Sequence, residues 1–454
     1  MDTAYIKKFP VDLFSFSEKE RNVFQKLIRA SELLAPLYGQ QKDIRYPGAG
    51  FYPADAAKQE IEIASQKNPA ILSPYTFVVR DKKGDLKAIP FHIRFKKELK
   101  PIAGLLREAA KISDDKNLSQ YLESRAKALL TDNYDESNIL WLKTEKSKIG
   151  SVIGPFDRYL DKIFFKKRAY MAWVGVLDEK RTREAERLNS MILSSERKFL
   201  PGAKKAKIPQ IRVRIEDTAI FSGLVADFMF AGNNLPSSAD IDLIKIHGAL
   251  FTVFNPSVRW RFEKWIWPIF QSVFNGEFQA RFSQEELYNG LLRSIVLHET
   301  CHSLTRYDDA AERLQEYFPF FDELHTDILA VKSCGLLLLK DALSQKELEA
   351  FLITYICRGL HWLTDSFQNP QLIHYATGGA ISLKFLLETG ALKKEAEKFI
   401  LDFGKVFICI DELSNVIEHY LALGKHNEAK EFIDEYGSLE VFEVFKDKLQ
   451  KFRE

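Results

Sequence analysis

The stretch SIVLHETCHSL, residues 294–304, places two of the chain's nine histidines four residues apart around a glutamate. On a helix, His298 and His302 would project from the same face one turn apart, as two ligands of one metal ion must. Leu291 and Ile295 belong to the same stripe, so the histidines continue an apolar row that faces inward. The spacing predicts a buried helix with a pair of metal ligands. The alternative is a helix with two ordinary core histidines.

Glu299 lies about 100° round the helix from His298. In an HExxH motif this glutamate is not a ligand but a base, which takes a proton from the water that attacks a carbonyl beside a zinc ion. The motif also arises by chance, so by itself it leaves the metal site and the ordinary core helix about equally well supported. A third ligand has to decide between them.

The segment that begins at Pro319, PFFDELHTDILAVKSCGLLLLK, predicts a second buried helix because it is apolar nearly all round. Glu323 and Asp327 lie one turn apart on one face of it, where an unpaired carboxylate would be costly. Metal coordination removes that cost for Glu323, and Asp327 can then accept the free ring N–H of a liganding histidine. We expect Glu323 to be the third ligand. Competing acids in the connecting segment are Asp308, Asp309, Glu312 and Glu316.

Length and composition predict a globular protein with more than one lobe, because 454 residues exceed the size at which one core usually stops growing. Lysine and arginine total 65 against 63 acidic residues without long blocks of either sign, so nucleic acid is not an expected partner. No stretch approaches the roughly 18 apolar residues that a membrane span requires. Four scattered cysteines and the lack of an apolar N-terminal leader favour a cytoplasmic protein.

Local patterns predict a mixed first part and a helical second part. The segment SPYTFVVRDKKGDLKAIPFHIRF has the signature of a β-hairpin around DKKGD, and Ser17 with Glu20 can form a capping box. Helical tracts are expected at 17–37, 97–146 and 155–195, and short strands at 210–215 and 249–254. After Asn255 nearly the whole chain has helical spacing.

We therefore expect a predominantly helical α+β protein of two lobes separated by a substrate cleft, with the zinc site on the helical lobe. Three regions are expected along the chain. They are 1–170, a mixed α/β region of the lower lobe; 171–400, a mainly helical zinc-binding region whose strand segment 221–257 joins the lower lobe; and 401–454, the C-terminal helices.

Together these residues resemble the gluzincin metallopeptidases, and more narrowly the dipeptidyl peptidase III family. That family carries a histidine–glutamate zinc motif followed by an acidic hexapeptide, E-E-x-x-x-[ED]. The corresponding stretch here is DELHTD, with Asp322 at the first glutamate, Glu323 as the implied ligand and Asp327 as the acid behind it. Many members have HExxxH, whereas HETCH has the spacing of a shorter branch.

Three further segments carry the resemblance. GPFDRYLDKIFFKKRAYMAWVGVLDEK is similar to the family segment with an E-x-Y-x-D core, and FAGNNLPSSADIDLIKIHGALFTVFN is similar to a substrate-binding segment with an N-[IL]-P-N motif. HYATGGAISLKFLLETGAL resembles the helix that follows the family's catalytic histidine. The matching positions are Asp157, Tyr159, Asp161, Asn234 and His374, while Ser237 replaces the second asparagine.

The resemblance implies a zinc exopeptidase that releases dipeptides from the N-terminus of short peptides. Tyr159 and His374 would donate hydrogen bonds to the oxyanion, Asp157 and Asn234 would hold the substrate's ammonium group, and the exposed edge of strand 249–255 would pair with the peptide backbone. The altered asparagine motif leaves two alternatives open. One is a peptide-binding or scaffolding protein with weak or no catalysis, and the other is an aminopeptidase or oligopeptidase of altered register.

Overall fold

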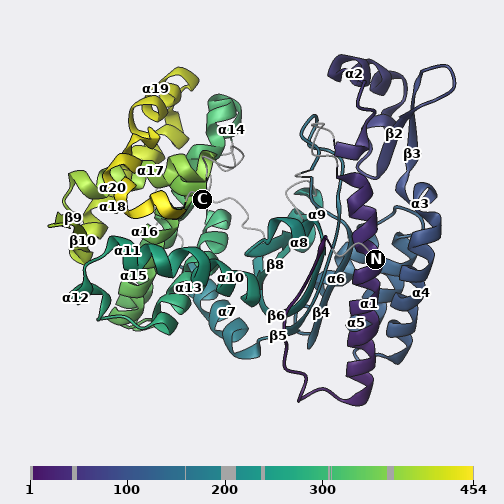
Figure 1. Cartoon of the computed structure of the whole chain (residues 1–454), viewed down its shortest axis with the longest axis horizontal. Helices are drawn as coiled ribbons and strands as arrows, with labels where there is room; N and C mark the ends of the chain where they lie inside the picture. Colours follow the sequence, from purple (N-terminus) through teal and green to yellow (C-terminus); the bar gives the residue numbers. More distant parts are fainter. Residues whose placement is uncertain are drawn as a thin grey trace. The chain divides into compact units, whose positions relative to one another are not determined.

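The computed structural model describes residues 4–42, 49–158, 160–195, 211–236, 241–304, 307, 309–365 and 373–452. The chain divides into two compact units, Met1–Thr182 with Pro209–Ser257 and Arg183–Ile208 with Val258–Glu454. The first unit combines a sheet with helices, and the second is almost entirely helical (Figure 1). The predicted α+β class with a helical majority is therefore confirmed. No helix in the described ranges combines the length and apolarity that a bilayer crossing needs.

The first unit is built round a sheet with the strand order β4–β5–β6–β8–β7, and β1 pairs with β6 off this path. The strands are β1 (Ile6–Lys8), β4 (Ile149–Pro155), β5 (Tyr170–Leu177), β6 (Ile211–Gly223), β7 (Gly232–Leu235) and β8 (Ala249–Phe254). Neighbouring strands are antiparallel except β6 and β8, where Ile211 lies opposite Ala249 and Glu216 opposite Phe254. The strands predicted at 210–215 and 249–254 are thus present, and they lie side by side.

The prediction of one helical tract over 155–195 is wrong for its first half. Residues Tyr170–Leu177 form β5 in the interior of the sheet, and helix α7 (Glu179–Leu193) begins only after it. The sequence YMAWVGVL is a continuous apolar run, which is what a strand covered on both faces requires. Periodicity alone cannot separate such a run from a buried helix.

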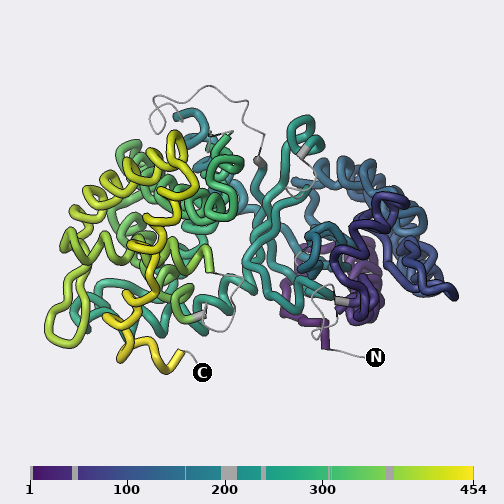
Figure 2. Tube along the Cα trace, turned by 90° about the horizontal axis from the view of Figure 1, so that it is seen from above, coloured from purple at the N-terminus to yellow at the C-terminus, as the bar shows by residue number. Residues whose placement is uncertain are grey.

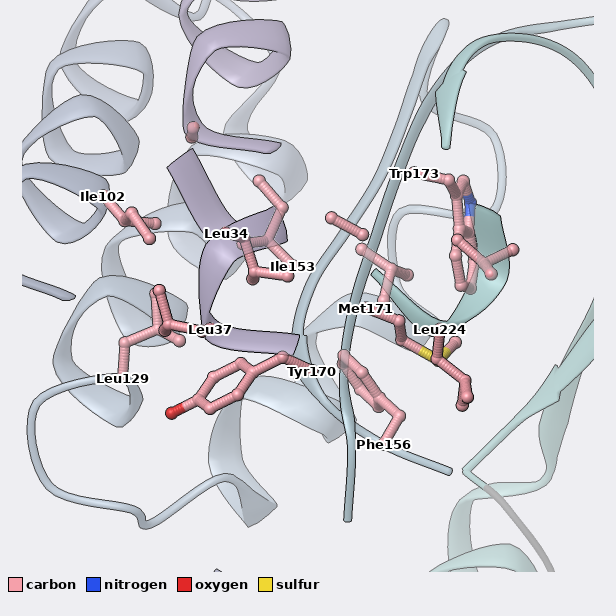
Figure 3. Close-up of a cluster of buried hydrophobic side chains, with 14 of the residues drawn as sticks. Leu34, Leu37, Ile102, Leu129, Ile153, Phe156, Tyr170, Met171, Trp173 and Leu224 are labelled. Atoms are coloured by element: carbon pink, nitrogen blue, oxygen red, sulfur yellow. The ribbon is translucent and has the colours of Figure 1, made fainter. Parts of the chain in front are cut away.

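Side chains from both faces of β5 fill the core of the first unit (Figure 3). Leu34 and Leu37 of α1 (Glu18–Gln41) lie on the same side as Tyr170, whereas Met171 lies toward Leu224. Helix α1 begins at the predicted capping box, in which Ser17 and Glu20 exchange hydrogen bonds. The other helices of this unit are α2 (Lys58–Lys67), α3 (Phe91–Arg94), α4 (Lys96–Ile112), α5 (Lys116–Ala128), α6 (Asp135–Leu142), α8 (Leu224–Phe228) and α9 (Ile241–His247).

The predicted hairpin is confirmed as a separate two-stranded sheet of the first unit. Its strands are β2 (Thr76–Arg80) and β3 (Leu86–Pro90), which pair antiparallel from Thr76 opposite Pro90 to Arg80 opposite Leu86. Asp81 closes the turn, because its side chain accepts hydrogen bonds from the backbone of Lys83 and Asp85. Gly84 adopts a φ of 89°, which its lack of a Cβ allows.

The second unit is a helical assembly (Figures 1 and 2). Its helices are α10 (Asn255–Arg261), α11 (Trp267–Val273), α12 (Gly276–Gln279), α13 (Gln284–Cys301), α14 (Ala310–Leu314), α15 (Phe318–Leu339), α16 (Gln345–Asp365), α17 (Ile373–Glu388), α18 (Phe403–Leu423), α19 (His426–Tyr436) and α20 (Phe442–Leu449). A short hairpin, β9 (Leu392–Glu395) with β10 (Lys398–Leu401), interrupts them. Both predicted buried helices are present as α13 and α15, and they pack against each other.

A glycine sets the close approach of α13 to α16. A Cβ added to Gly290 would lie 2.6 Å from the carbonyl oxygen of Ala350, which belongs to the backbone of α16 and cannot rotate away. Because α13 carries both histidines of the HExxH motif, this contact helps to fix the position of that motif in the second unit.

We expect Gly290→Ala to lower the free energy of unfolding by about 1–3 kcal/mol, the usual effect of forcing extra volume into a packed interface. The matched control is Gly104→Ala in α4, where an added Cβ meets nothing within 4 Å. This second variant should gain roughly 0.5–1 kcal/mol from the better helix propensity of alanine. Thermal and urea denaturation of both variants measures the difference, and equal effects would contradict the proposed contact.

Candidate metal centre

His298, His302 and Glu323 converge on one point in the second unit. His298 lies in the last turn of α13, His302 in the 3-10 turn that continues it, and Glu323 in the second turn of α15. Glu323 Oε2 is 3.3 Å from His298 Nε2 and 3.8 Å from His302 Nε2. One ligand atom from each side chain lies within 4.8 Å of the other two, which is close enough for a single ion to contact all three.

The chemistry of this group fits zinc. Two imidazole nitrogens and one carboxylate oxygen form one of the usual donor sets of catalytic zinc sites. Glu323 Oε2 is buried and has no hydrogen-bond partner among the described residues, although it lies between two ring nitrogens. A buried carboxylate needs a compensating positive charge, which a protonated His298 supplies in the metal-free protein and which a bound metal ion would replace.

Asp327 lies behind His298, where the sequence predicts it. Its Oδ1 accepts a hydrogen bond of 2.8 Å from His298 Nδ1, so the opposite ring nitrogen faces Glu323. Arg358 Nη2 donates to the same oxygen at 3.3 Å. Burial raises the pKa of Asp327, but the charges of Arg358 and His298 outweigh it and lower this pKa to about 2. Asp327 is therefore a permanent carboxylate that holds the ring of His298 in place.

His302 has different neighbours. Thr326 Oγ1 lies 3.3 Å from His302 Nδ1, and the nearer carboxylate on this side, Asp322 Oδ2, is 4.0 Å away. Burial raises the pKa of Asp322, and the charge of His302 opposes that shift. The two imidazoles are thus oriented by unlike groups, a carboxylate for one and a hydroxyl for the other.

His374 and Glu299 also lie in this unit. Glu299 is half-buried in the last turn of α13, directly after His298. His374 is half-buried in the first turn of α17, with its ring centroid 4.3 Å from that of Tyr375. Burial lowers the pKa of His374, and the negative charge of Glu323 opposes this shift. His374 is therefore close enough to the three-residue group to sense its charge.

Three of the four competing acids of the connecting segment lie in the described residues, and these are engaged elsewhere or exposed. Asp309 pairs with Arg313 at 2.8 Å, and Glu316 contacts His426 at 3.0 Å. Glu312 is exposed, and Asp308 lies outside the described residues. Glu323 is the acid whose carboxylate lies beside the Nε2 atoms of both histidines in the described structure.

The substrate-binding residues implied by the resemblance, Asp157 and Asn234, belong to the first unit. Asp157 is buried and accepts a 2.8 Å hydrogen bond from Asn233 Nδ2. Neighbouring residues of a strand point to opposite faces, so only one asparagine of β7 can meet Asp157. That Asp157 and Asn234 hold the substrate's ammonium group stays a prediction, and the structure adds Asn233 as the residue whose amide contacts Asp157. Tyr159 and Ser237 lie outside the described residues.

Asp161 has a structural function in the same segment. Its carboxylate accepts hydrogen bonds from the backbone N–H groups of Ile163, Phe164, Lys166 and Lys167, and a fifth from the hydroxyl of Tyr52. These bonds fold the loop that leads from Asp157 to β5.

The prediction that strand 249–255 offers an exposed edge is wrong. On one side β8 pairs with β6, and on the other Gly232–Leu235 of β7 lies antiparallel to Leu250–Val253. Strand β7 contains the sequence NNL, residues 233–235, and it pairs with the edge of β8 that would otherwise be exposed. The strand at this end of the described sheet is β7.

Comparisons with solved structures place these features in a known architecture. Dipeptidyl-peptidase III from Caldithrix abyssi superposes with a TM-score of 0.87 over 97% of this chain and 94% of that one, at 22% sequence identity. The dipeptidyl-peptidase III of Corallococcus sp. strain EGB superposes with a TM-score of 0.77 over 97% and 93%, at 21% identity. The chain has the dipeptidyl-peptidase III fold. The family resemblance of the sequence is thus confirmed at the level of the fold.

Comparisons of sequence add one relative beyond the dipeptidyl-peptidase III structures. The chain is 24% identical over 434 residues to a protein of Arabidopsis thaliana named Nudix hydrolase 3. The match covers 87% of this chain but 54% of the plant protein, so the chain spans about half the length of that relative. The name Nudix hydrolase 3 was given to the whole plant protein, which is about twice as long as the matched segment. No protein-family model matches the sequence.

Three residues of this dipeptidyl-peptidase III fold escaped the sequence analysis. Arg358 of α16 contacts Asp327, and Tyr375 of α17 donates a 3.4 Å hydrogen bond to Glu323 Oε1. Asn233 contacts Asp157. The sequence gives a weak indication for Tyr375, because this residue follows His374, the histidine that the resemblance singles out. It gives no indication for Arg358, because an arginine in an amphipathic helix is usually solvated.

We expect zinc binding to displace a proton from His298. Burial lowers the pKa of His298, but Asp327 and Glu323 outweigh it and raise this pKa to about 10 in the metal-free protein. Below that pH the ring is protonated and zinc competes with the proton, so the apparent affinity should rise about tenfold per pH unit between pH 7 and 9.

Titration calorimetry at pH 8 in two buffers of different ionisation enthalpy measures this release. Asp327→Asn keeps an acceptor for the ring but removes the charge, so it should reduce the release. Asp309→Asn, whose carboxylate pairs with Arg313, is the control and should behave like the unaltered protein. Zinc binding without proton release at pH 8 would contradict the raised pKa.

Proposed function

We propose that the protein is a zinc-dependent metallopeptidase that hydrolyses short peptides from their N-terminus, in the manner of dipeptidyl-peptidase III. The observation that carries the proposal is Glu323 Oε2, which is buried without a hydrogen bond between His298 Nε2 and His302 Nε2. The fold shared with two dipeptidyl-peptidase III structures supports it.

In this proposal His298, His302 and Glu323 hold the zinc. When bound, zinc supplies a Lewis acid that polarises the scissile carbonyl and makes water a better nucleophile at neutral pH. Asp327 keeps His298 in the orientation that binds metal, and its own charge is secured by Arg358. Tyr375 holds the other oxygen of Glu323, so that Oε2 stays directed at the histidines.

Glu299 is the proposed general base. It follows His298 on α13 and is half-buried, so it can take a proton from the attacking water without occupying a ligand position. His374 and Tyr159 are the proposed donors to the oxyanion. Burial lowers the pKa of His374, which favours a neutral ring that still carries one N–H to donate.

Asp157 is the proposed acceptor of the substrate's N-terminal ammonium group, and Asn233 fixes the position of its carboxylate. Asn234, whose Oδ1 has no partner within the described ranges, is a further candidate acceptor. The outer edge of β7 is the proposed backbone partner of an extended peptide, in place of β8. A cleft between the lobes and a cytoplasmic location stay predictions.

Glu299→Gln should keep zinc but reduce turnover of a short peptide by about 10²- to 10⁴-fold, the usual contribution of a general base. The control is Glu412→Gln, which removes an exposed carboxylate from α18. Metal analysis of each purified variant gives the zinc content, and chromatography with mass spectrometry follows the products. An unchanged rate in Glu299→Gln at full zinc occupancy would remove Glu299 from the mechanism.

Recognition of the free N-terminus gives a second test. Peptides of four to eight residues should lose an N-terminal dipeptide, whereas their N-acetylated forms should not be cleaved, because they lack the ammonium group that Asp157 accepts. Asp157→Asn should raise KM for the free peptides more than it lowers kcat. Cleavage after one residue would indicate an aminopeptidase register. Zinc-independent peptide binding without cleavage would support the scaffolding alternative.

A further inference from the structure

We propose that Thr326 is a positioning residue that fixes the tautomer of His302, so that the Nε2 lone pair of this ring is available to a metal. The inference deepens the proposed function and rests on it for its purpose. It concerns the hydrogen bonding of the protein itself, however, and can be tested in the metal-free protein.

The hydrogen atom of the Thr326 hydroxyl is already committed. Thr326 is fully buried in α15, and its Oγ1 donates a 2.8 Å hydrogen bond to the carbonyl oxygen of Asp322, one turn earlier. A hydroxyl has one hydrogen to give. Toward His302 Nδ1, at 3.3 Å, Oγ1 can therefore only accept. The ring hydrogen must lie on Nδ1, which leaves the lone pair on Nε2, 3.8 Å from Glu323 Oε2.

The Thr326 hydroxyl is nearer to His302 Nδ1 than the carboxylate of Asp322 is. Asp322 Oδ2 lies 4.0 Å from His302 Nδ1, beyond hydrogen-bonding distance. On the other ring, Asp327 Oδ1 lies 2.8 Å from His298 Nδ1. One helix, α15, thus provides a carboxylate for the first histidine and a hydroxyl for the second, from the neighbouring positions 327 and 326.

The two acceptors differ in charge, and this has a chemical consequence. A carboxylate that accepts from one ring nitrogen increases the basicity of the other, whereas a neutral hydroxyl orients the ring with little such effect. His298 is therefore the stronger donor and His302 the weaker one. This arrangement gives each ring an acceptor at Nδ1, while the third carboxylate, that of Asp322, stays 4.0 Å from His302 Nδ1.

The experiment compares Thr326→Val, which keeps the shape and removes the acceptor, with Thr326→Ser, which keeps the hydroxyl. Nitrogen-15 spectra of the full-length metal-free protein, labelled on histidine and recorded where His302 is neutral, report which ring nitrogen carries the hydrogen. We expect Thr326→Val to lose the preference for Nδ1–H and to bind zinc at least tenfold more weakly in chelator competition, and Thr326→Ser to retain both.

Two further variants sharpen the comparison. Thr354→Val removes another buried hydroxyl that donates to its own helix, at the carbonyl of Phe351, and should leave the His302 signals and zinc affinity unchanged. In the double variant Asp322→Glu with Thr326→Val, the longer carboxylate can reach Nδ1 and should recover most of the lost affinity.

Thr326→Val with unaltered ring signals and unaltered zinc affinity would overturn the proposal. So would an equal loss in Thr326→Ser, because that result would assign Thr326 to packing. If the unaltered protein bound no zinc, the proposed function would fail, whereas the spectra of the metal-free protein would still decide the tautomer.

Discussion

One buried oxygen atom constrains the second unit. Glu323 Oε2 is directed by the fold at two imidazole nitrogens and forms no hydrogen bond within the described residues. An isolated buried carboxylate typically costs several kcal/mol, so a stable protein has to place compensating charge beside it. In the metal-free protein the protonated ring of His298 supplies that charge, 3.3 Å from Oε2, while Asp327 orients this ring and Tyr375 donates to the other oxygen of Glu323.

The candidate site was predictable as far as helical geometry reaches. Two histidines at i and i+4, and a glutamate and aspartate at i and i+4, each lie on one face of a helix, and apolar neighbours mark both faces as buried. Sequence spacing thus predicts that two pairs of side chains each lie on one buried helix face. It does not predict which other helices pack against those two faces. Arg358 and Tyr375 come from α16 and α17, whose register against α15 follows from packing of the whole unit.

The sheet was less predictable for a related physical reason. An apolar run such as that of β5 satisfies a buried strand and a buried helix equally well, and only its partners on both sides make it a strand. The same holds for β7, where four residues between a short helix and a proline carry little strand signal. Once they pair with β8, alternation decides that Asn233, and not Asn234, meets Asp157. The capping box of α1 and the turn of the β2–β3 hairpin were predictable because residues close together in the sequence form them.

The division of the chain between its units has a consequence for synthesis. The chain passes from one unit to the other three times, after residues 182, 208 and 257. The sheet of the first unit stays incomplete until β8 has left the ribosome, because β8 is the strand that lies beside β6 and also pairs with β7, which precedes it in the sequence. More than half of the polypeptide must therefore be made before either core can close. In nascent chains shorter than this, the edge of β6 that later pairs with β8 has no partner strand, and an unpaired strand edge is prone to aggregation.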